Sequence, residues 1–409
     1  MRRWNLVLSG LGVATMLLSS GCDSTVGLDP TRTSFTKVIV PGACKAQDDL
    51  GQIDFSVMLL DGTRALLPDT RLNGEVEPVG GLLDFDNFAF SKAPSNADLN
   101  IAEPAVATLG EGGDPQGVGL NPIGLEFVYS GGIDRQRDPR LVVFMLDHSG
   151  SLVGVDPFSM MFDPTRASDS DDQRISFFQQ LIGNLPNEYL LSLVSFSGDF
   201  ADITPDYSTP VRNKSVILEG LNNLQFEEGG TTPLTRALDD TRSRVIEPNA
   251  GMNPVVILFT DGVEDGDPTD SEGGFEAAID GYANRAGAPI PVIVIHLQPP
   301  PAVPAEQRGR SARLAELACR TGGEYIFLQN ADEFTTNNNL QPAVLNRIVG
   351  VWRLSAQSTL SNAGFGPGGW LLSTQIAVTL AGRSLSADLQ RARESSGTFS
   401  DTRVWFSKE

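Results

Sequence analysis

The chain has 409 residues, of which 40% are hydrophobic. That size allows two domains, and the composition is typical of a globular protein rather than a disordered one. The formal net charge of −21 produces a field that repels nucleic acid, so we predict no nucleic-acid partner. The two histidines, His148 and His296, and the three cysteines form no zinc-ligand spacing, which argues against zinc chemistry.

The N-terminus has the three-part pattern of a secretory signal. Two arginines precede an apolar stretch over residues 6–18, and small residues follow up to Cys22. The apolar stretch is too short to cross a membrane as a helix. We therefore predict a signal peptide over residues 1–21, followed by a polar tether over residues 22–34.

The end of this segment, LLSSGC, resembles a bacterial lipobox, in which the cysteine is acylated and becomes the first residue of the mature protein. The resemblance implies lipidation of Cys22 and a lipid-anchored place in the cell envelope, on the periplasmic face or the cell surface. Ser19 stands where that pattern usually has leucine, and a plain cleaved signal peptide is the alternative. With Cys22 acylated, Cys44 and Cys319 remain as an even pair, either as a disulfide or as two buried thiols.

Residues 35–137 are predicted to form strands and turns. Apolar, partly alternating runs lie at residues 36–40 and 53–60 and end in Pro-Gly and Asp-Gly turn signals. Further strands are expected at residues 83–90 and 123–129. The Gly/Pro/Asn-rich stretch over residues 93–122 is expected to be a loop.

Residues 138–350 alternate apolar runs with helical segments. The runs at residues 141–146, 190–196, 255–260 and 291–296 are continuous, which is typical of strands buried on both faces. Helices are expected between them, at about residues 173–184, 213–224, 234–245, 275–286 and 306–320. A strand at residues 324–328 and a last helix at about residues 342–349 complete the unit. Strands joined by helices predict an α/β fold with a doubly wound, mostly parallel sheet.

Residues 351–409 return to strand-like sequence, rich in β-branched and aromatic residues. Neither β-rich flank has enough strands to form a stable sandwich by itself. We therefore expect residues 35–137 and 351–409 to pair into one sandwich-like β domain, with the α/β unit inserted between them.

Three segments of the α/β unit place oxygen-bearing side chains at one edge of the predicted sheet. One follows the strand at residues 141–146, one is a GGTTPL loop that opens a helix, and one follows the strand at residues 255–260. The side chains are those of Asp147, Ser149, Ser151, Thr231, Thr232 and Asp261. Ligands of open parallel sheets bind at the carboxyl ends of the strands, so this edge is the candidate site.

The three segments together resemble the metal-ion-dependent adhesion site of von Willebrand factor type A domains, with its DxSxS motif, loop threonine and later aspartate. The resemblance implies a Rossmann-like fold for residues 138–350. It also implies a divalent cation, Mg²⁺ foremost and Mn²⁺ or Ca²⁺ as alternatives, held by Asp147, Ser149, Ser151, Thr232 and Asp261. Thr232 aligns with the family's threonine, and Thr231 stays open as the alternative.

The function expected from such a site is binding. Several of the implied ligands are uncharged, so a bound cation keeps positive character that a carboxylate of a partner could neutralise. We expect a membrane-tethered extracytoplasmic protein that engages a protein or peptide ligand through an acidic residue. A structural or assembly role in the envelope, with the metal only stabilising the domain, is the alternative. The sequence contains no nucleophile elbow, phosphate-cradling loop or HExxH motif, so we expect that the protein is not an enzyme.

The segment over residues 152–172 is longer and more acidic than the family's usual turn into the first helix. It contains Asp156, Asp163, Asp169, Asp171 and Asp172. The simpler interpretation is a solvated loop, and the alternatives are a second cation such as Ca²⁺ or a role in partner choice.

Overall fold

The computed structural model describes the greater part of the chain. The described residues are 37–39, 52–61, 64–65, 67–68, 89–90, 99–101, 105–109, 116–130, 140–155, 161–198, 200–204, 210–224, 229–262, 272–284, 289–299, 308–309, 311–359, 370–380 and 383–393. The predicted signal peptide, the tether, Cys22 and Cys44 lie outside them. No helix among the described residues is long and apolar enough to cross a membrane.

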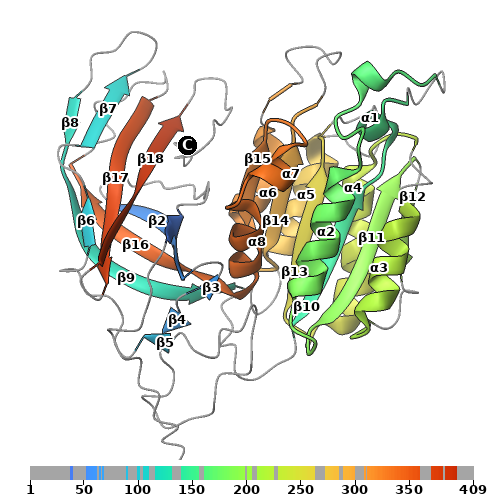
Figure 1. Ribbon diagram of the computed structural model, residues 1–409, viewed down its shortest axis with the longest axis horizontal. Coiled ribbons are helices and arrows are strands. Elements are labelled where there is room, and N and C mark those ends of the chain that lie inside the picture. The colour runs from blue at the N-terminus through green and yellow to red at the C-terminus, as the bar shows by residue number, and fades with distance from the viewer. Residues whose placement is uncertain are drawn as a thin grey trace, which may run out of the picture.

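A six-stranded sheet forms the centre of the α/β unit (Figure 1). Its strands are β10 (Leu141–Asp147), β11 (Leu190–Ser197), β12 (Phe200–Thr204), β13 (Pro254–Thr260), β14 (Val292–Leu297) and β15 (Glu324–Leu328). The order is β12-β11-β10-β13-β14-β15, with β12 antiparallel to β11 and the other pairs parallel. The predicted doubly wound, mostly parallel fold is confirmed, whereas the antiparallel edge strand β12 was not predicted.

Helices cover both faces of this sheet (Figure 1). They are α1 (Gly150–Val153), α2 (Gln173–Asn184), α3 (Lys214–Asn223), α4 (Leu234–Thr241), α5 (Glu272–Ala283), α6 (Ala312–Arg320), α7 (Glu333–Thr336) and α8 (Leu340–Val349). The helix expected over residues 306–320 begins only at Ala312. The hydroxyl of Ser311 accepts a hydrogen bond of 3.3 Å from the amide of Leu314 and so caps the helix there.

The core lies in two layers, one on each face of the sheet. Because successive side chains of a strand point to opposite faces, β10 contributes Val142 and Phe144 to one layer and Val143 and Met145 to the other. The first layer is completed by apolar side chains of α2, α3 and α8, and the second by those of α4, α5 and α6. This double burial explains why the central strands have continuous apolar sequences.

Two further sheets are built from the flanks. The first contains β1 (Lys37–Ile39), β2 (Gln52–Asp61), β3 (Arg64–Ala65), β9 (Leu120–Tyr129) and β16 (Gly350–Ser358). The second contains β6 (Leu99–Ile101), β7 (Ala105–Leu109), β8 (Gln116–Val118), β17 (Trp370–Leu380) and β18 (Arg383–Arg393). A short pair, β4 (Leu67–Pro68) with β5 (Ala89–Phe90), is separate. Within these sheets β16 pairs with β2 and β9, and β17 pairs with β6 and β7, so strands from both flanks lie together.

The prediction of a loop over residues 93–122 is wrong in part, because this stretch contains β6, β7, β8 and the start of β9. These strands are too short for an alternating pattern to be visible in the sequence. Two of them pair with β17, which is far away along the chain, so tertiary pairing decides their conformation. Pro122 lies opposite Ala356, where the pairing of β9 with β16 is irregular, a position that tolerates a missing amide donor.

A buried polar cluster lies where the chain enters and leaves the α/β unit. The guanidinium of Arg347, at the end of α8, donates to Glu324 Oε2 at 3.2 Å and to the hydroxyl of Ser130 at 3.2 Å. Arg140, just before β10, donates to the carbonyl of Ser130 at 3.2 Å. Burial outweighs the attraction of Arg347 and raises the pKa of Glu324 to about 7. The cluster thus ties the last strand and last helix of the unit to the end of β9.

Candidate metal centre

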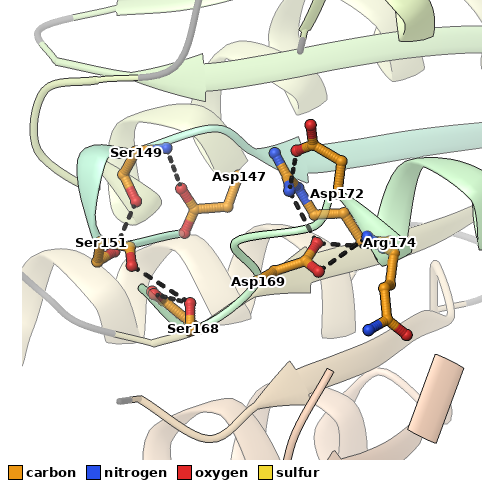
Figure 2. A network of polar contacts seen from close by, with 9 residues as sticks. Asp147, Ser149, Ser151, Ser168, Asp169, Asp172 and Arg174 are labelled. Carbon is orange, nitrogen blue, oxygen red and sulfur yellow. Dashed lines mark hydrogen bonds and ion pairs between the residues drawn. The ribbon is translucent and has the colours of Figure 1, made fainter. Parts of the chain in front are cut away.

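The turn after β10 brings two serine hydroxyls together. The amide of Ser149 donates to Asp147 Oδ1 at 2.8 Å, and the hydroxyl oxygens of Ser149 and Ser151 are 3.0 Å apart (Figure 2). Gly150 makes this turn possible, because a Cβ there would lie 2.3 Å from the carbonyl oxygen of Val155. The DxSxS segment therefore presents three oxygen-bearing side chains at the carboxyl end of the first central strand.

The loop before α4 lies directly against this turn. The amide of Gly150 donates to the carbonyl of Gly230 at 3.0 Å, and Gly230 has a φ of +79°, which favours glycine. The hydroxyl of Thr231 donates to the carbonyl of Gly198 at 3.1 Å, so this threonine braces the neighbouring loop. The hydroxyl of Thr232 is fully buried and has no hydrogen-bond partner among the described residues.

The third segment follows β13 and is linked to the first by Thr260. The hydroxyl of Thr260 donates to Asp147 Oδ2 at 2.6 Å and accepts from the amide of Gly262 at 3.0 Å. The hydroxyl of Ser168 donates to Asp261 Oδ2 at 2.9 Å. The structure thus adds Thr260 and Ser168 to the site. Thr260 lay next to a motif residue in the sequence, whereas no spacing rule pointed to Ser168.

The centre holds two buried carboxylates that repel each other. Asp147 and Asp261 are both fully buried. Burial, and then the charge of Asp261, raises the pKa of Asp147 to about 7, although hydrogen bonds from Thr260 and Ser149 oppose the rise. No basic side chain is among the causes that act on Asp147. A cation held by these two carboxylates would offset their repulsion.

The residues present fit a hard divalent cation. A buried hydroxyl without a partner costs free energy, and a metal ion at Thr232 would satisfy its oxygen. Among the described residues no group of three or more His, Cys, Asp or Glu side chains could hold a metal, so any ion here depends on the hydroxyls. The donors available to it are Asp147, Ser149, Ser151, Thr232 and Asp261. All are oxygen ligands, as Mg²⁺ prefers.

The two histidines of the chain are engaged beside the site. His148 Nε2 lies 2.8 Å from the hydroxyl of Ser197. His296 Nδ1 lies 2.7 Å from the hydroxyl of Tyr325, and its Nε2 lies 3.3 Å from the carbonyl oxygen of Asp261. A Cβ at Gly262 would lie 2.5 Å from His296 Nε2, so the ring packs tightly against the loop that carries Asp261. His296 therefore supports the backbone of this loop.

Part of the acidic segment at residues 152–172 stabilises the start of α2. The carboxylate of Asp169 is buried, accepts from the amide of Gln173 at 2.8 Å and pairs with Arg174 Nη1 at 2.8 Å (Figure 2). Asp172 Oδ1 lies 3.0 Å from the same guanidinium nitrogen. Burial raises the pKa of Asp169, against the influence of Arg174. The interpretation of this segment as a solvated loop is therefore wrong for Asp169, whose carboxylate binds the start of α2.

Cys319, at the end of α6, is disulfide-bonded. Cys44 and Cys22 lie outside the described residues. The pairing of Cys319 with Cys44 stays a prediction.

The family model of the von Willebrand factor type A domain matches residues 142–341. The chain therefore contains a von Willebrand factor type A domain, made of the six-stranded sheet and its helices. Domains of this family commonly mediate adhesion or protein binding, and they often bind a divalent metal at the edge of the sheet described above.

No curated protein matches the chain. Among solved structures it is similar to proximal thread matrix protein 1 from the mussel byssus, at 14% identity and a TM-score of 0.38, over 58% of this chain and 51% of that one. Another form of that protein has zinc in its adhesion-site motif. The chain spans about half the length of these mussel proteins.

Two bacterial structures are also similar. A von Willebrand factor type A protein from Catenulispora acidiphila shares 10% identity with a TM-score of 0.37, over 75% of each chain. The open form of the pilus adhesin SpaC from Lactobacillus rhamnosus GG shares 13% identity with a TM-score of 0.37, over 85% of this chain and 55% of that one.

Proposed function

We propose that the chain is an extracytoplasmic binding protein whose von Willebrand factor type A domain holds a divalent cation, Mg²⁺, and uses it to engage an acidic residue of a protein or peptide ligand. The observation that carries the proposal is the buried pair Asp147 and Asp261 beside the partnerless hydroxyl of Thr232. The lipobox-like sequence around Cys22 supports tethering of this domain to a membrane of the cell envelope.

The donor set favours capture of a carboxylate. Asp147 and Asp261 supply the negative charge, and Ser149, Ser151 and Thr232 supply neutral oxygens. Hydroxyl ligands leave a divalent ion with unsatisfied positive charge. A carboxylate from a partner is the natural group to complete the coordination, because it is a hard oxygen ligand with a negative charge.

Thr232 is the threonine we assign to the ion. The hydroxyl of Thr231 already donates to Gly198, whereas that of Thr232 is buried without a partner. A buried hydroxyl that lacks a partner in the protein is the group that gains most from a metal ion.

Binding rather than catalysis is the role we propose. His148 and His296 are the side chains best suited to general acid–base chemistry near neutral pH. Their rings contact Ser197 in one case and Tyr325 and Asp261 in the other, in supporting roles. Metal-dependent hydrolysis by the purified protein, lost in Asp261→Ala, would contradict this part of the proposal.

A structural role for the ion is the second candidate function, favoured by one observation. Because burial and Asp261 raise the pKa of Asp147 to about 7, a cation would stabilise the domain even if no ligand were bound. In that case the envelope role would be one of assembly, and the ion would not contact the partner.

A crosslinked pull-down from envelope extract separates the two functions. The bait is the full chain, in Mg²⁺ or in EDTA, with Asp147→Asn as the variant that keeps the shape of the site and lacks its charge. If the ion bridges the partner, a defined protein is captured only by the wild type in Mg²⁺ and is released by EDTA. Capture that is unaffected by EDTA and by Asp147→Asn would contradict the bridging role.

A further inference from the structure

Two exposed apolar side chains lie in the segment that joins α1 to α2. Met161 is 69% exposed and Phe162 is 67% exposed, and together with Ile123 (48%) they are the exposed large apolar residues among those the structure describes. Exposure of large apolar side chains to water is unfavourable, and apolar side chains that are exposed next to each other offer a partner a surface to cover.

The segment that carries this pair is fastened to itself. Phe162 forms an antiparallel bridge with Val155, and the amide of Asp163 donates to the carbonyl of Gly154 at 2.8 Å. Gly154 has a φ of +82°, and a Cβ there would lie 2.2 Å from the carbonyl oxygen of Asp163, so only glycine allows this approach. The carboxylate of Asp163 accepts from the amide and the hydroxyl of Thr165 at 3.0 and 2.7 Å. Phe162 is therefore presented by a hydrogen-bonded turn.

The same segment is attached at both ends to the candidate metal centre. The amide of Val155, the bridge partner of Phe162, donates to the carbonyl of Gly150 at 2.7 Å, within the DxSxS turn. At the other end, the amide of Ser168 donates to the carbonyl of Ser151 at 3.1 Å, and its hydroxyl donates to Asp261. Figure 1 shows α1 at the end of the sheet where this centre lies. The turn that carries the apolar pair is thus hydrogen-bonded to the segments that form the ion site.

We propose that Met161 and Phe162 form an apolar ledge that binds the apolar side chain next to the ligand's carboxylate; this rests on the proposed function of the ion site. The occupant is a peptide segment of a partner protein in which Asp or Glu is adjacent to a large apolar residue. The carboxylate would bind the ion, and its neighbour would cover the ledge. Since this chain has a net charge of −21, a partner that is neutral or basic overall fits the site best.

The ledge gives the site a selectivity that an ion alone cannot supply. Any exposed carboxylate can approach a cation, whereas an apolar contact distinguishes one neighbouring residue from another. Truncation of a well-buried aromatic side chain at an interface commonly weakens binding about tenfold or more. We therefore expect Met161 and Phe162 to determine which acidic segments bind.

An array of immobilised peptides tests the proposal. Each peptide carries one Glu, and the residue beside it is varied from Gly through polar to large apolar residues. The full-length protein is applied in Mg²⁺ or in EDTA as wild type, as Met161→Ser/Phe162→Ser and as Ile123→Ser, the matched control on β9. The Mg²⁺-induced rise in melting temperature is measured for each variant to verify that it still binds the ion.

The expected result is Mg²⁺-dependent binding that is strongest where Glu has a large apolar neighbour. In the double variant this preference is lost and those signals fall about tenfold, while Ile123→Ser behaves as wild type. Mg²⁺-dependent binding without any apolar preference, or with a preference that persists in the double variant, overturns the ledge and leaves the ion site standing. If no acidic peptide binds in a Mg²⁺-dependent way, the proposed function itself is contradicted, and the ledge with it.

Discussion

The hydroxyl of Thr260 donates a hydrogen bond of 2.6 Å to Asp147 Oδ2 and so joins the ends of the two central strands β10 and β13. The other carboxylate oxygen of Asp147 accepts from the amide of Ser149, so both oxygens are held in place. Groups that orient a ligand of a metal in this way typically influence metal affinity strongly.

Thr260→Val therefore weakens Mg²⁺ binding by roughly 10–100-fold. Valine keeps the shape of the side chain and removes the donor, so Asp147 loses a hydrogen bond that lowers its pKa. Calorimetric titration with Mg²⁺ gives the affinity. Thr260→Ser restores the donor and is expected to recover most of it, and equal affinities of the valine variant and the wild type would contradict this role.

Ser168→Ala tests the contact that the sequence did not reveal. Removal of the donor to Asp261 Oδ2 is expected to weaken Mg²⁺ binding by about tenfold or more, because Asp261 is no longer held toward the site. The exposed Ser170, two residues later, provides the matched control Ser170→Ala. If both variants bind Mg²⁺ as the wild type does, Ser168 has no part in the centre.

Asp169→Asn is expected to destabilise the α/β domain by about 3–5 kcal/mol, since it leaves the buried guanidinium of Arg174 without its closest charge partner. Urea unfolding measures the change. Arg236→Met breaks the pair of the exposed Arg236 with the partly buried Asp240, in which the charged atoms are 3.9 Å apart, and should cost about 1 kcal/mol or less. Similar losses for both variants would mean that Asp169 is not a structural anchor of α2.

Glu324→Gln tests the cluster at the entry to the α/β unit through its pH dependence. The folded pKa of Glu324, about 7, lies above the ordinary value of 4.5, so the folded protein holds a proton that the unfolded chain has released. Its contribution to stability is thus present at low pH and is lost as the pH rises through about 7.

Wild type is therefore expected to lose stability relative to Glu324→Gln between about pH 5 and pH 8, as measured by urea unfolding at both values. The comparison with the variant removes the contributions of the many other carboxyl groups. A wild type that gains stability relative to the variant over this range would show that the pair with Arg347 outweighs the cost of burial.

Much of the α/β unit could be predicted from the sequence because its signals are local. Continuous apolar runs such as that of β10 indicate strands buried on both faces, and α2 and β15 have the bounds that the sequence predicted. The edge strand β12 and the short strands β6 to β8 lack such signals. The strands β6 and β7 pair with β17, which is far away along the chain, while β8 pairs with β7 and β12 pairs with β11.

Part of the candidate site could likewise be predicted from local motifs, and part depends on contacts between distant segments. Asp147, Ser149 and Ser151 are placed by a short motif, and the structure brings their segment together with those of Thr232 and Asp261. The sequence could not show which of the two adjacent threonines lacks a hydrogen-bond partner, because this depends on the position of the Gly198 carbonyl, to which Thr231 donates. Ser168 and the buried pair of Asp169 with Arg174 depend on the path of a long segment, for which the sequence has no rule.

The most direct test of the central claim compares the melting temperatures of the wild type and Asp147→Asn, each in Mg²⁺ and in EDTA. In EDTA the variant should be at least as stable as the wild type, because it removes a buried charge that is repelled by Asp261. Mg²⁺ at about a hundred times its Kd should raise the wild-type melting temperature on the order of 5–10 °C and leave the variant unchanged. The absence of a shift in the wild type, or an equal shift in both proteins, would contradict a metal centre at this edge of the sheet.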